Sequence, residues 1–218
     1  MTETTRITYL FDPLCGWCYG ASPTIKALAE QPGLAVDLMP TGLFSNPDAP
    51  LMDAGFAAYA WANDQRIAKL TGQTFSAEYR TQVLADRTKR MDSGPATLAL
   101  TAVAMTAPAR ELEALRAIQT ARYVEGRDIT SSAVLAQILR DLSLTDAAGR
   151  LQAAAPDLLA ALRDRVKAAD AKMHQFGLNG VPALLVEDGQ SQRLIPSGAL
   201  FGDTNLVAQL TNGESLRH

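Results

Sequence analysis

Several features are scarce in this sequence, and each shortage argues against a class of function. Lysine and arginine number 20 against 23 acidic residues, which gives a formal net charge of −3, and no basic run offers a surface for nucleic acid. The thiol and imidazole groups are limited to Cys15, Cys18, His174 and His218, a set that does not predict a closed zinc site. We therefore expect neither a nucleic acid partner nor a bound metal.

Long apolar segments are also scarce. The longest, at 95–107, is shorter than the roughly 18–20 residues that span a bilayer, and threonines interrupt it. The residues before Asp12 include one arginine and too few apolar side chains for a signal peptide. We expect a cytoplasmic protein without a membrane partner. Thiols stay reduced in that compartment, so a lone cysteine pair indicates catalysis or metal binding rather than a structural disulfide.

The first part of the chain predicts a strand, a helix and a second strand. RITYLF at 6–11 is β-branched, aromatic and apolar on both faces, which is typical of a buried strand. The spacing at 15–30 is helical, with Pro23 expected to kink the helix, and 34–40 predicts the next strand.

The middle of the chain, from about 51 to 176, is rich in Ala and Leu and predicts helices nearly throughout. Apolar residues repeat at helical spacing at 135–142 and 158–173, which predicts buried faces. The expected helix boundaries are Gly94-Pro95, Gly126 and Ala155-Pro156.

The last part predicts two strands, at 181–188 and 192–198, and a short helix at 203–210. Gly189 lies in the expected tight turn between the strands. Asp203 or Thr204 is the expected N-cap of the helix.

Cys15 and Cys18 lie where the first strand gives way to the helix. A cysteine at a helix start is close to unpaired N–H groups and to the positive end of the helix dipole, and both favour a thiolate at Cys15. Cys18, one turn further, can form a disulfide with Cys15 and should be more buried and less acidic. This asymmetry predicts that Cys15 attacks a partner disulfide and Cys18 resolves the mixed disulfide. A regulatory disulfide without turnover, or two core cysteines at this spacing by chance, are the alternatives.

The segment FDPLCGWC at 11–18, with Pro23 eight residues after the first cysteine, resembles the thioredoxin superfamily. The segment GVPALL at 180–185 is similar to the superfamily's cis-proline strand. The long helical block resembles the DsbA-like branch, and TGLF at 41–44 and MDSGPA at 91–96 resemble its cytoplasmic FrnE-like members, described as protein-disulfide isomerases.

The resemblance implies an α/β thioredoxin fold, β-α-β followed by β-β-α, interrupted by a large all-helical insertion. Residues 1–50 and 174–218 would form one discontinuous thioredoxin-like domain, and 51–173 would form the insertion.

The resemblance also implies roles for residues of the site. Pro182 would follow a cis peptide bond, and the backbone of Val181 would pair with an extended substrate segment. Gly16 and Trp17 would form the active-site loop. No histidine stands between the cysteines, so we expect a weaker oxidant than periplasmic DsbA. Trp17 either offers an apolar surface to substrates or packs on the fold.

Other residues are secondary candidates. Asp12 is either a turn residue before Pro13 or a group that raises the thiol pKa and relays a proton. His174 either modulates the site or complements the dipole at the end of a long helix. Lys26 and Asp37 would form a buried charged pair beneath the dithiol. Four aromatic residues of the helical block either line a groove over the site or belong to the core: Phe56, Tyr59, Trp61 and Phe75.

These features predict a cytosolic thiol-disulfide oxidoreductase of the isomerase or reductase type, a monomer or homodimer acting on disulfide- or thiol-containing proteins or small thiols. We expect no bound cofactor, and redox exchange with glutathione or a dithiol partner. One alternative is a glutathione-dependent transferase or isomerase of the kappa-class type, which has no need of a resolving thiol such as Cys18. Another is a non-enzymatic protein that binds client peptides along Val181 and Pro182.

Overall fold

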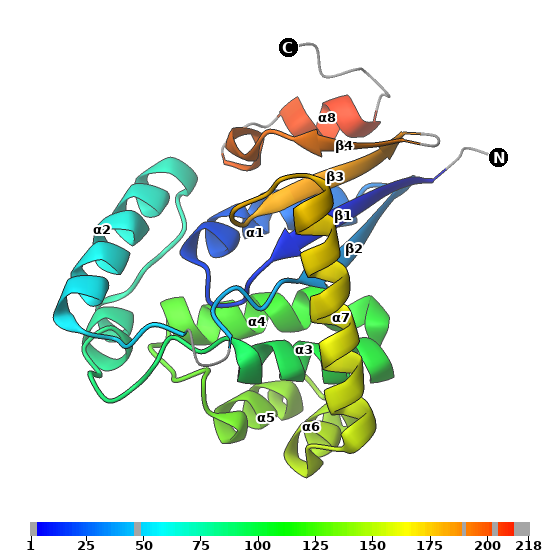
Figure 1. The fold of residues 1–218 in the computed structure, drawn as a ribbon. Helices are drawn as coiled ribbons and strands as arrows, with labels where there is room; N and C mark the ends of the chain where they lie inside the picture. The colour runs from blue at the N-terminus through cyan, green and yellow to red at the C-terminus, as the bar shows by residue number, and fades with distance from the viewer. Residues whose placement is uncertain (1–3, 46–48, 189–190, 202–204, 212–218) are drawn as a thin grey trace.

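A four-stranded sheet in the order β2-β1-β3-β4 lies at the centre of the fold (Figure 1). The computed structural model describes residues 4–45, 49–188, 191–201 and 205–211. Strand β1 (Thr5–Phe11) pairs in parallel with β2 (Leu34–Pro40) and antiparallel with β3 (Ala183–Asp188). Strand β4 (Ser191–Ile195) pairs antiparallel with β3 and completes the described sheet.

Strand β1 is buried on both faces, as its continuous apolar run predicts. Ile7, Tyr9 and Phe11 point into the larger core, which α1 (Gly16–Ala29) and the helical block share. Leu10 points to the opposite face and packs with Ala169 of α7 (Pro156–Gln175). Side chains alternate along a strand, so a central strand covered on both faces is apolar throughout.

Helix α1 begins one residue later and ends one residue earlier than the sequence predicts. Pro23 lies inside it with an exposed side chain, and the kink expected there stays a prediction.

The helical block contains α2 (Ala54–Thr71), α3 (Gly94–Thr106), α4 (Glu111–Tyr123), α5 (Ser132–Asp141), α6 (Thr145–Ala153) and most of α7. Helix α3 packs against α4, α5, α6 and α7 and is the centre of the block. The expected boundaries are confirmed: Pro95 and Pro156 lie in the first turns of α3 and α7, and Gly126 follows α4 with a φ of +68°. Short 3-10 and π-helical turns lie at Pro108–Arg110 and Tyr79–Val83.

Two features of the block differ from the sequence prediction. The segment from 84 to 93 is not helical, because its backbone pairs with that of 50–52. The N–H of Met52 bonds to the Lys89 carbonyl oxygen, and the N–H of Met91 bonds to the Pro50 carbonyl oxygen. In α7, Leu158 and Ala169 are buried but Leu159 is exposed. Helix α7 runs along the outside of the sheet (Figure 1), so only a narrow stripe of it is covered.

The C-terminal part follows the expected order. Strand β4 ends at Ile195, three residues before the predicted end, because Pro196 leads into a 3-10 turn at Ser197–Leu200. Helix α8 (Asn205–Thr211) follows. Gly189, Asp203 and Thr204 lie outside the described residues. The proposed division into 1–50 with 174–218, and 51–173, stays a prediction. Among the described helices, none has the length and apolar character that a membrane span requires.

Candidate active site

The two cysteines lie at the start of α1, and both are free thiols. Cys15 is the N-cap residue, with extended backbone, and its N–H bonds to the Asp12 carbonyl oxygen at 3.1 Å. Cys15 is 6% exposed and Cys18 is 1% exposed, so the predicted difference in burial is confirmed. Burial raises the pKa of the Cys18 thiol well above its ordinary value, and the hydrogen bond and charge of Cys15 raise it further. Cys15 is therefore the more exposed thiol of the pair and Cys18 the more buried one.

Val181 and Pro182 form the opposite wall, and the peptide bond between them is cis, as the resemblance implies. The Sγ of Cys15 donates to the Val181 carbonyl oxygen at 3.6 Å. Residues 166 positions apart in the chain thus meet at the end of the sheet. The pairing of Val181 with a substrate segment stays a prediction.

Asp12 lies at the centre of a buried hydrogen-bond network beneath the cysteines. Its carboxylate accepts from the N–H of Leu14 at 2.8 Å, which is the predicted turn, and also from the N–H of Phe44 at 3.2 Å and the Ser93 hydroxyl at 2.6 Å. The TGLF and MDSGPA segments therefore meet at the site. Burial raises the pKa of Asp12, although these hydrogen bonds oppose the shift. The charge of Asp12 raises the pKa of Cys18, but a hydrogen bond to the Asp12 backbone lowers it, so the second predicted role of Asp12 stays a prediction.

Gly16 and Trp17, which lie between the cysteines, pack tightly against neighbouring elements. A Cβ at Gly16 would lie 2.5 Å from Oδ1 of Asp64 and 3.3 Å from Cδ1 of Ile67, so α2 packs where only glycine fits. Trp17 is half-buried, and its ring meets that of Phe201 edge to face at 5.1 Å. Trp17 therefore packs on the fold and also borders two cavities.

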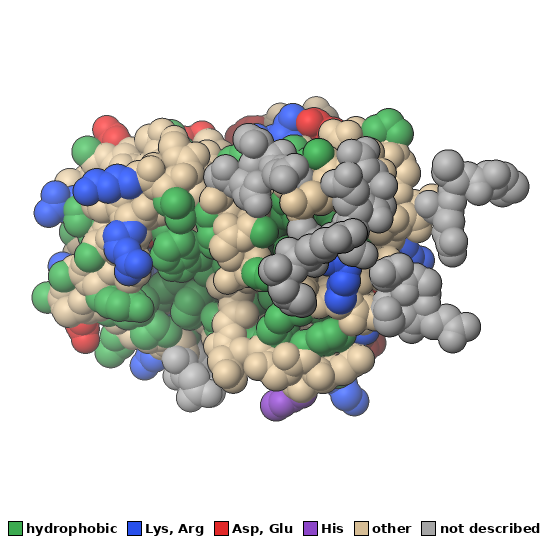
Figure 2. Space-filling model, turned by 90° about the horizontal axis from the view of Figure 1, so that it is seen from above, with side chains coloured by type: hydrophobic (Ala, Val, Ile, Leu, Met, Phe, Trp, Pro, Cys, Tyr) green, Lys and Arg blue, Asp and Glu red, His purple; other side chains and the backbone are tan. Residues whose placement is uncertain are grey.

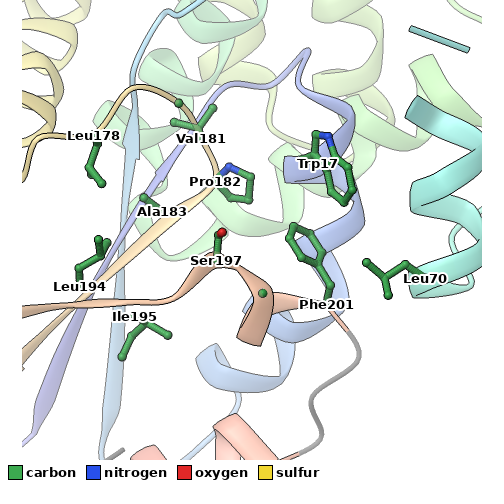
Figure 3. Close-up of a pocket in the computed structure, with 12 residues that line it drawn as sticks. Trp17, Leu70, Leu178, Val181, Pro182, Ala183, Leu194, Ile195, Ser197 and Phe201 are labelled. Carbon is green, nitrogen blue, oxygen red and sulfur yellow. The ribbon is translucent and has the colours of Figure 1, made fainter. Parts of the chain in front are cut away.

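The larger cavity, about 570 Å³, lies between Trp17 and the start of β3. Trp17 and Phe201 face Pro182 across it, and Leu178 and Leu194 lie on the side away from Trp17 (Figure 3). Its lining is mostly apolar. Hydrophobic side chains also gather in a hollow on the side of the molecule where α2 lies (Figure 2).

The smaller cavity, about 230 Å³, lies between α1, α2 and α4 and is lined by Cys15 itself. Phe56 and Tyr59 line it, so for these two residues the structure favours the groove over the core alternative. Trp61 instead lies beneath Arg80, whose guanidinium is 5.0 Å from the ring centroid, and Phe75 is buried among other aromatic rings.

Four further residues at this cavity were missed by the sequence reasoning: Asp64, Tyr79, Arg122 and Tyr123. The Tyr123 hydroxyl donates to the Leu14 carbonyl oxygen at 2.7 Å and so holds the turn before Cys15. The Tyr79 hydroxyl donates to Oδ2 of Asp64 at 3.0 Å. Burial raises the pKa of Asp64 to about 7, although the Tyr79 hydrogen bond and the Arg122 charge oppose the shift.

A signal for two of these residues was present in the sequence. Asp64 precedes Ile67 by three residues, and Arg122 follows Ile118 by four, so each charge lies on a face that is otherwise apolar. A charged residue on the buried face of a helix needs a specific partner or function.

The remaining candidates lie away from the thiols. His174 is in the last turn of α7, exposed, with Nε2 3.5 Å from Oδ1 of Asp170, and it lines neither cavity. The predicted Lys26–Asp37 pair is wrong. Lys26 pairs with Glu30 in the last turn of α1, and Asp37 pairs across the sheet with Arg6, all with partly exposed side chains. In the described part of the chain, no three metal-ligating residues come together.

The chain is similar to known proteins over nearly its whole length. A family profile described as the DSBA-like thioredoxin domain matches residues 6–208. The cytosolic disulfide reductase DsbM from Pseudomonas aeruginosa is 32% identical, with a TM-score of 0.84 over 96% of this chain and 98% of DsbM. A DsbM structure with GSH gives a TM-score of 0.81 at 31% identity, with the same coverage. A proposed protein disulfide isomerase from Nitrosomonas europaea is 25% identical, with a TM-score of 0.77 over 97% of this chain and 99% of that one. A comparison with curated protein sequences gave no match.

Proposed function

Because the chain belongs to the family of DSBA-like thioredoxin domains, we propose that it is a cytoplasmic thiol-disulfide oxidoreductase with a reductase or isomerase role. The observation that carries the proposal is the position of two free thiols at the start of α1, with the Cys15 Sγ 3.6 Å from the Val181 carbonyl oxygen. The similarity to DsbM, named as a cytosolic disulfide reductase, supports both the reaction and the compartment.

In the proposed reaction, the Cys15 thiolate attacks one sulfur of a substrate disulfide. A mixed disulfide forms, and the other substrate sulfur leaves as a thiolate and takes a proton from water. Cys18 then attacks the Cys15 sulfur, which forms the Cys15–Cys18 disulfide and releases the second substrate thiol. Two electrons have passed from the protein to the substrate. The opposite direction follows the same steps in reverse.

The surroundings of the thiols suit this division of roles. The raised pKa of Cys18 keeps it protonated while Cys15 reacts, so the mixed disulfide forms before it is resolved. Asp12 is a buried carboxyl group that acts on Cys18, and we assign it the proton that Cys18 loses. The DsbM structure with GSH supports a small thiol, such as glutathione, as the exchange partner that returns the protein to its starting state.

The proposal is tested by insulin reduction and by refolding of a protein with scrambled disulfides. Cys15→Ser should abolish both activities, and Cys18→Ser should accumulate a mixed disulfide visible by mass spectrometry. Full activity of Cys15→Ser would refute the dithiol mechanism. Titration of the dithiol against glutathione gives the direction of electron flow, and we expect a potential below the strongly oxidising value of about −120 mV.

The larger cavity favours a second function, the binding of client peptides beside Val181 and Pro182. If binding alone is the function, a Cys15→Ser/Cys18→Ser variant would bind an unfolded client as tightly as the wild type and the wild type would not reduce insulin. A kappa-class type of glutathione transfer is tested in Cys18→Ser with chlorodinitrobenzene. The presence of Cys18 argues against that reaction, because glutathione transfer does not need a resolving thiol.

A further inference from the structure

Arg122 is a buried cation at the cavity that contains Cys15. Its side chain is 2% exposed and its guanidinium carbon lies 5.5 Å and 5.6 Å from the ring centroids of Tyr79 and Tyr123. Its Nε has no hydrogen-bond partner. Burial lowers the pKa of Arg122, but the two phenol groups and Asp64 more than offset this, so the guanidinium is charged.

No acid within the described part of the chain forms an ion pair with Arg122. Asp64, which accepts the Tyr79 hydroxyl on the cavity side, and Asp12 interact with Arg122 through charge but form no ion pair with it. On the far side, Asp86 is bonded to Thr88, and Asp128 is bonded to Thr130 and paired with Lys89. A buried charge without a direct counter-ion is costly unless a ligand supplies one.

The cavity itself resembles a site for a small anionic molecule. Among the described residues that line it, Arg122 is the one base and Asp64 the one acid, and most of the others are apolar or aromatic. Ligand sites commonly combine an apolar lining with a few polar groups that fix orientation. At about 230 Å³ the cavity has room for part of a small molecule, whereas the larger cavity beyond Trp17 suits a protein segment.

We propose that this cavity binds small carboxylate-bearing disulfides and thiols, with Arg122 pairing with the carboxylate while Cys15 reacts with the sulfur. The inference rests on the proposed thiol-disulfide chemistry and adds a substrate class and a specificity residue to it. The reduced protein transfers two electrons to the small disulfide, which leaves the Cys15–Cys18 disulfide and two molecules of small thiol. Arg122 takes no part in the electron transfer and acts through charge alone.

The test compares two probes of similar size, dithiodipropionate, which carries carboxylates, and bis(2-hydroxyethyl) disulfide, which is neutral. The reduced protein is mixed with each probe in 0.15 M salt, roughly the physiological ionic strength, so that long-range repulsion from the net negative charge is screened. Loss of protein thiols is followed by quenching with iodoacetamide and mass spectrometry. The readout is the ratio of the two rate constants, because a change in Cys15 reactivity alters both rates together.

Arg122→Met should lower this ratio at least tenfold, with the neutral probe reacting within a factor of about three of the wild-type rate. Arg80→Met is the matched control, because Arg80 also lies over an aromatic ring but faces a different hollow, and its ratio should equal that of the wild type. If Arg122→Met does not fold, the same ratio is measured in Asn63→Asp instead. It places a negative charge in the lining of the cavity and should lower the ratio several-fold.

An unchanged ratio in the folded Arg122→Met variant, or in Asn63→Asp when that variant decides, overturns the inference. The proposed function would survive that result if the wild type still reduces insulin and the neutral probe. A wild-type protein that reduces neither insulin nor either probe would instead refute the proposed function.

Discussion

At the scale of single residues, buried charges set the chemistry around the thiols. Asp12 and Asp64 are almost fully buried, and burial raises the pKa of each even though each accepts a hydrogen bond from a hydroxyl group. Desolvation of each carboxylate outweighs the hydrogen bonds that it accepts, three at Asp12 and one at Asp64. Such groups reduce stability at neutral pH, and carboxyl groups with raised pKa values are typical of functional sites.

Asp64→Asn should stabilise the protein by an amount that grows with pH. In the unfolded chain the carboxyl group ionises near 3.8, and in the folded protein near 7. The folded state therefore holds a proton that the unfolded state has lost, and stability falls as pH rises through this window and stays low above it. The shift of about three pH units sets an upper limit of about 4 kcal/mol, less whatever the variant loses in hydrogen bonding to Tyr79.

Urea unfolding of both proteins at pH 5, 6, 7 and 8 measures this difference. Other titrating groups are common to both proteins and cancel in the comparison. A difference that stays constant from pH 5 to pH 8 would contradict the raised pKa of Asp64.

At the scale of elements, the close packing of α1 on α2 determines where the thiols face. Gly16 and Gly20 are one helical turn apart in α1, and both approach Ile67 of α2. A Cβ at Gly20 would lie 2.6 Å from Cγ2 of Ile67. The two glycines therefore form a flat surface on which α2 rests, and the same contact closes one side of the smaller cavity.

Gly20→Ala should destabilise the protein by about 1–3 kcal/mol, because overpacking outweighs the helix propensity gained by alanine, about 1 kcal/mol. In an Ile67→Ala background, Gly20→Ala should cost less, since the clashing atom is absent, although Ile67→Ala itself destabilises the protein by removing a fully buried side chain. Gly149→Ala in α6 is the matched control. No atom lies within 4 Å of its added Cβ, so it should stabilise by about 0.5–1 kcal/mol. Urea unfolding of these variants gives their free energies of unfolding. Equal effects of Gly20→Ala and Gly149→Ala would show that α2 does not press on α1.

At the scale of the whole molecule, the features that local sequence patterns determine could be predicted, and those that depend on long-range packing could not. Strand β2 has the predicted bounds, and the start of α1 was located within one residue, because periodicity, glycine and proline act over short distances. The Asp64–Tyr79–Arg122 cluster joins α2, a π-helical turn and α4, and no local pattern specifies such a meeting. The predicted Lys26–Asp37 pair was wrong for the same reason, since Lys26 pairs with Glu30 and Asp37 pairs with Arg6.

A largely buried ion pair connects the sheet to the helical block. Arg165 of α7 donates to Glu111 of α4 at 2.6 Å and to the Leu38 carbonyl oxygen of β2 at 3.0 Å. Burial raises the pKa of Glu111 even with Arg165 beside it. One side chain therefore holds three elements together, and its partner acid depends on it for charge balance.

Arg165→Met should destabilise the protein by about 3–5 kcal/mol at pH 8, because it leaves Glu111 buried without a counter-ion and Leu38 without its hydrogen bond. The pKa of Glu111 rises further in the variant, so the loss should shrink as pH falls and Glu111 takes up a proton. Arg165→Met/Glu111→Gln should recover much of the stability at pH 8, since no buried charge then remains at this position. Thermal and urea unfolding at pH 5 and pH 8 measure these differences. A double variant no more stable than the single one at pH 8 would mean that the bond to Leu38, rather than the ion pair, carries the connection between sheet and helices.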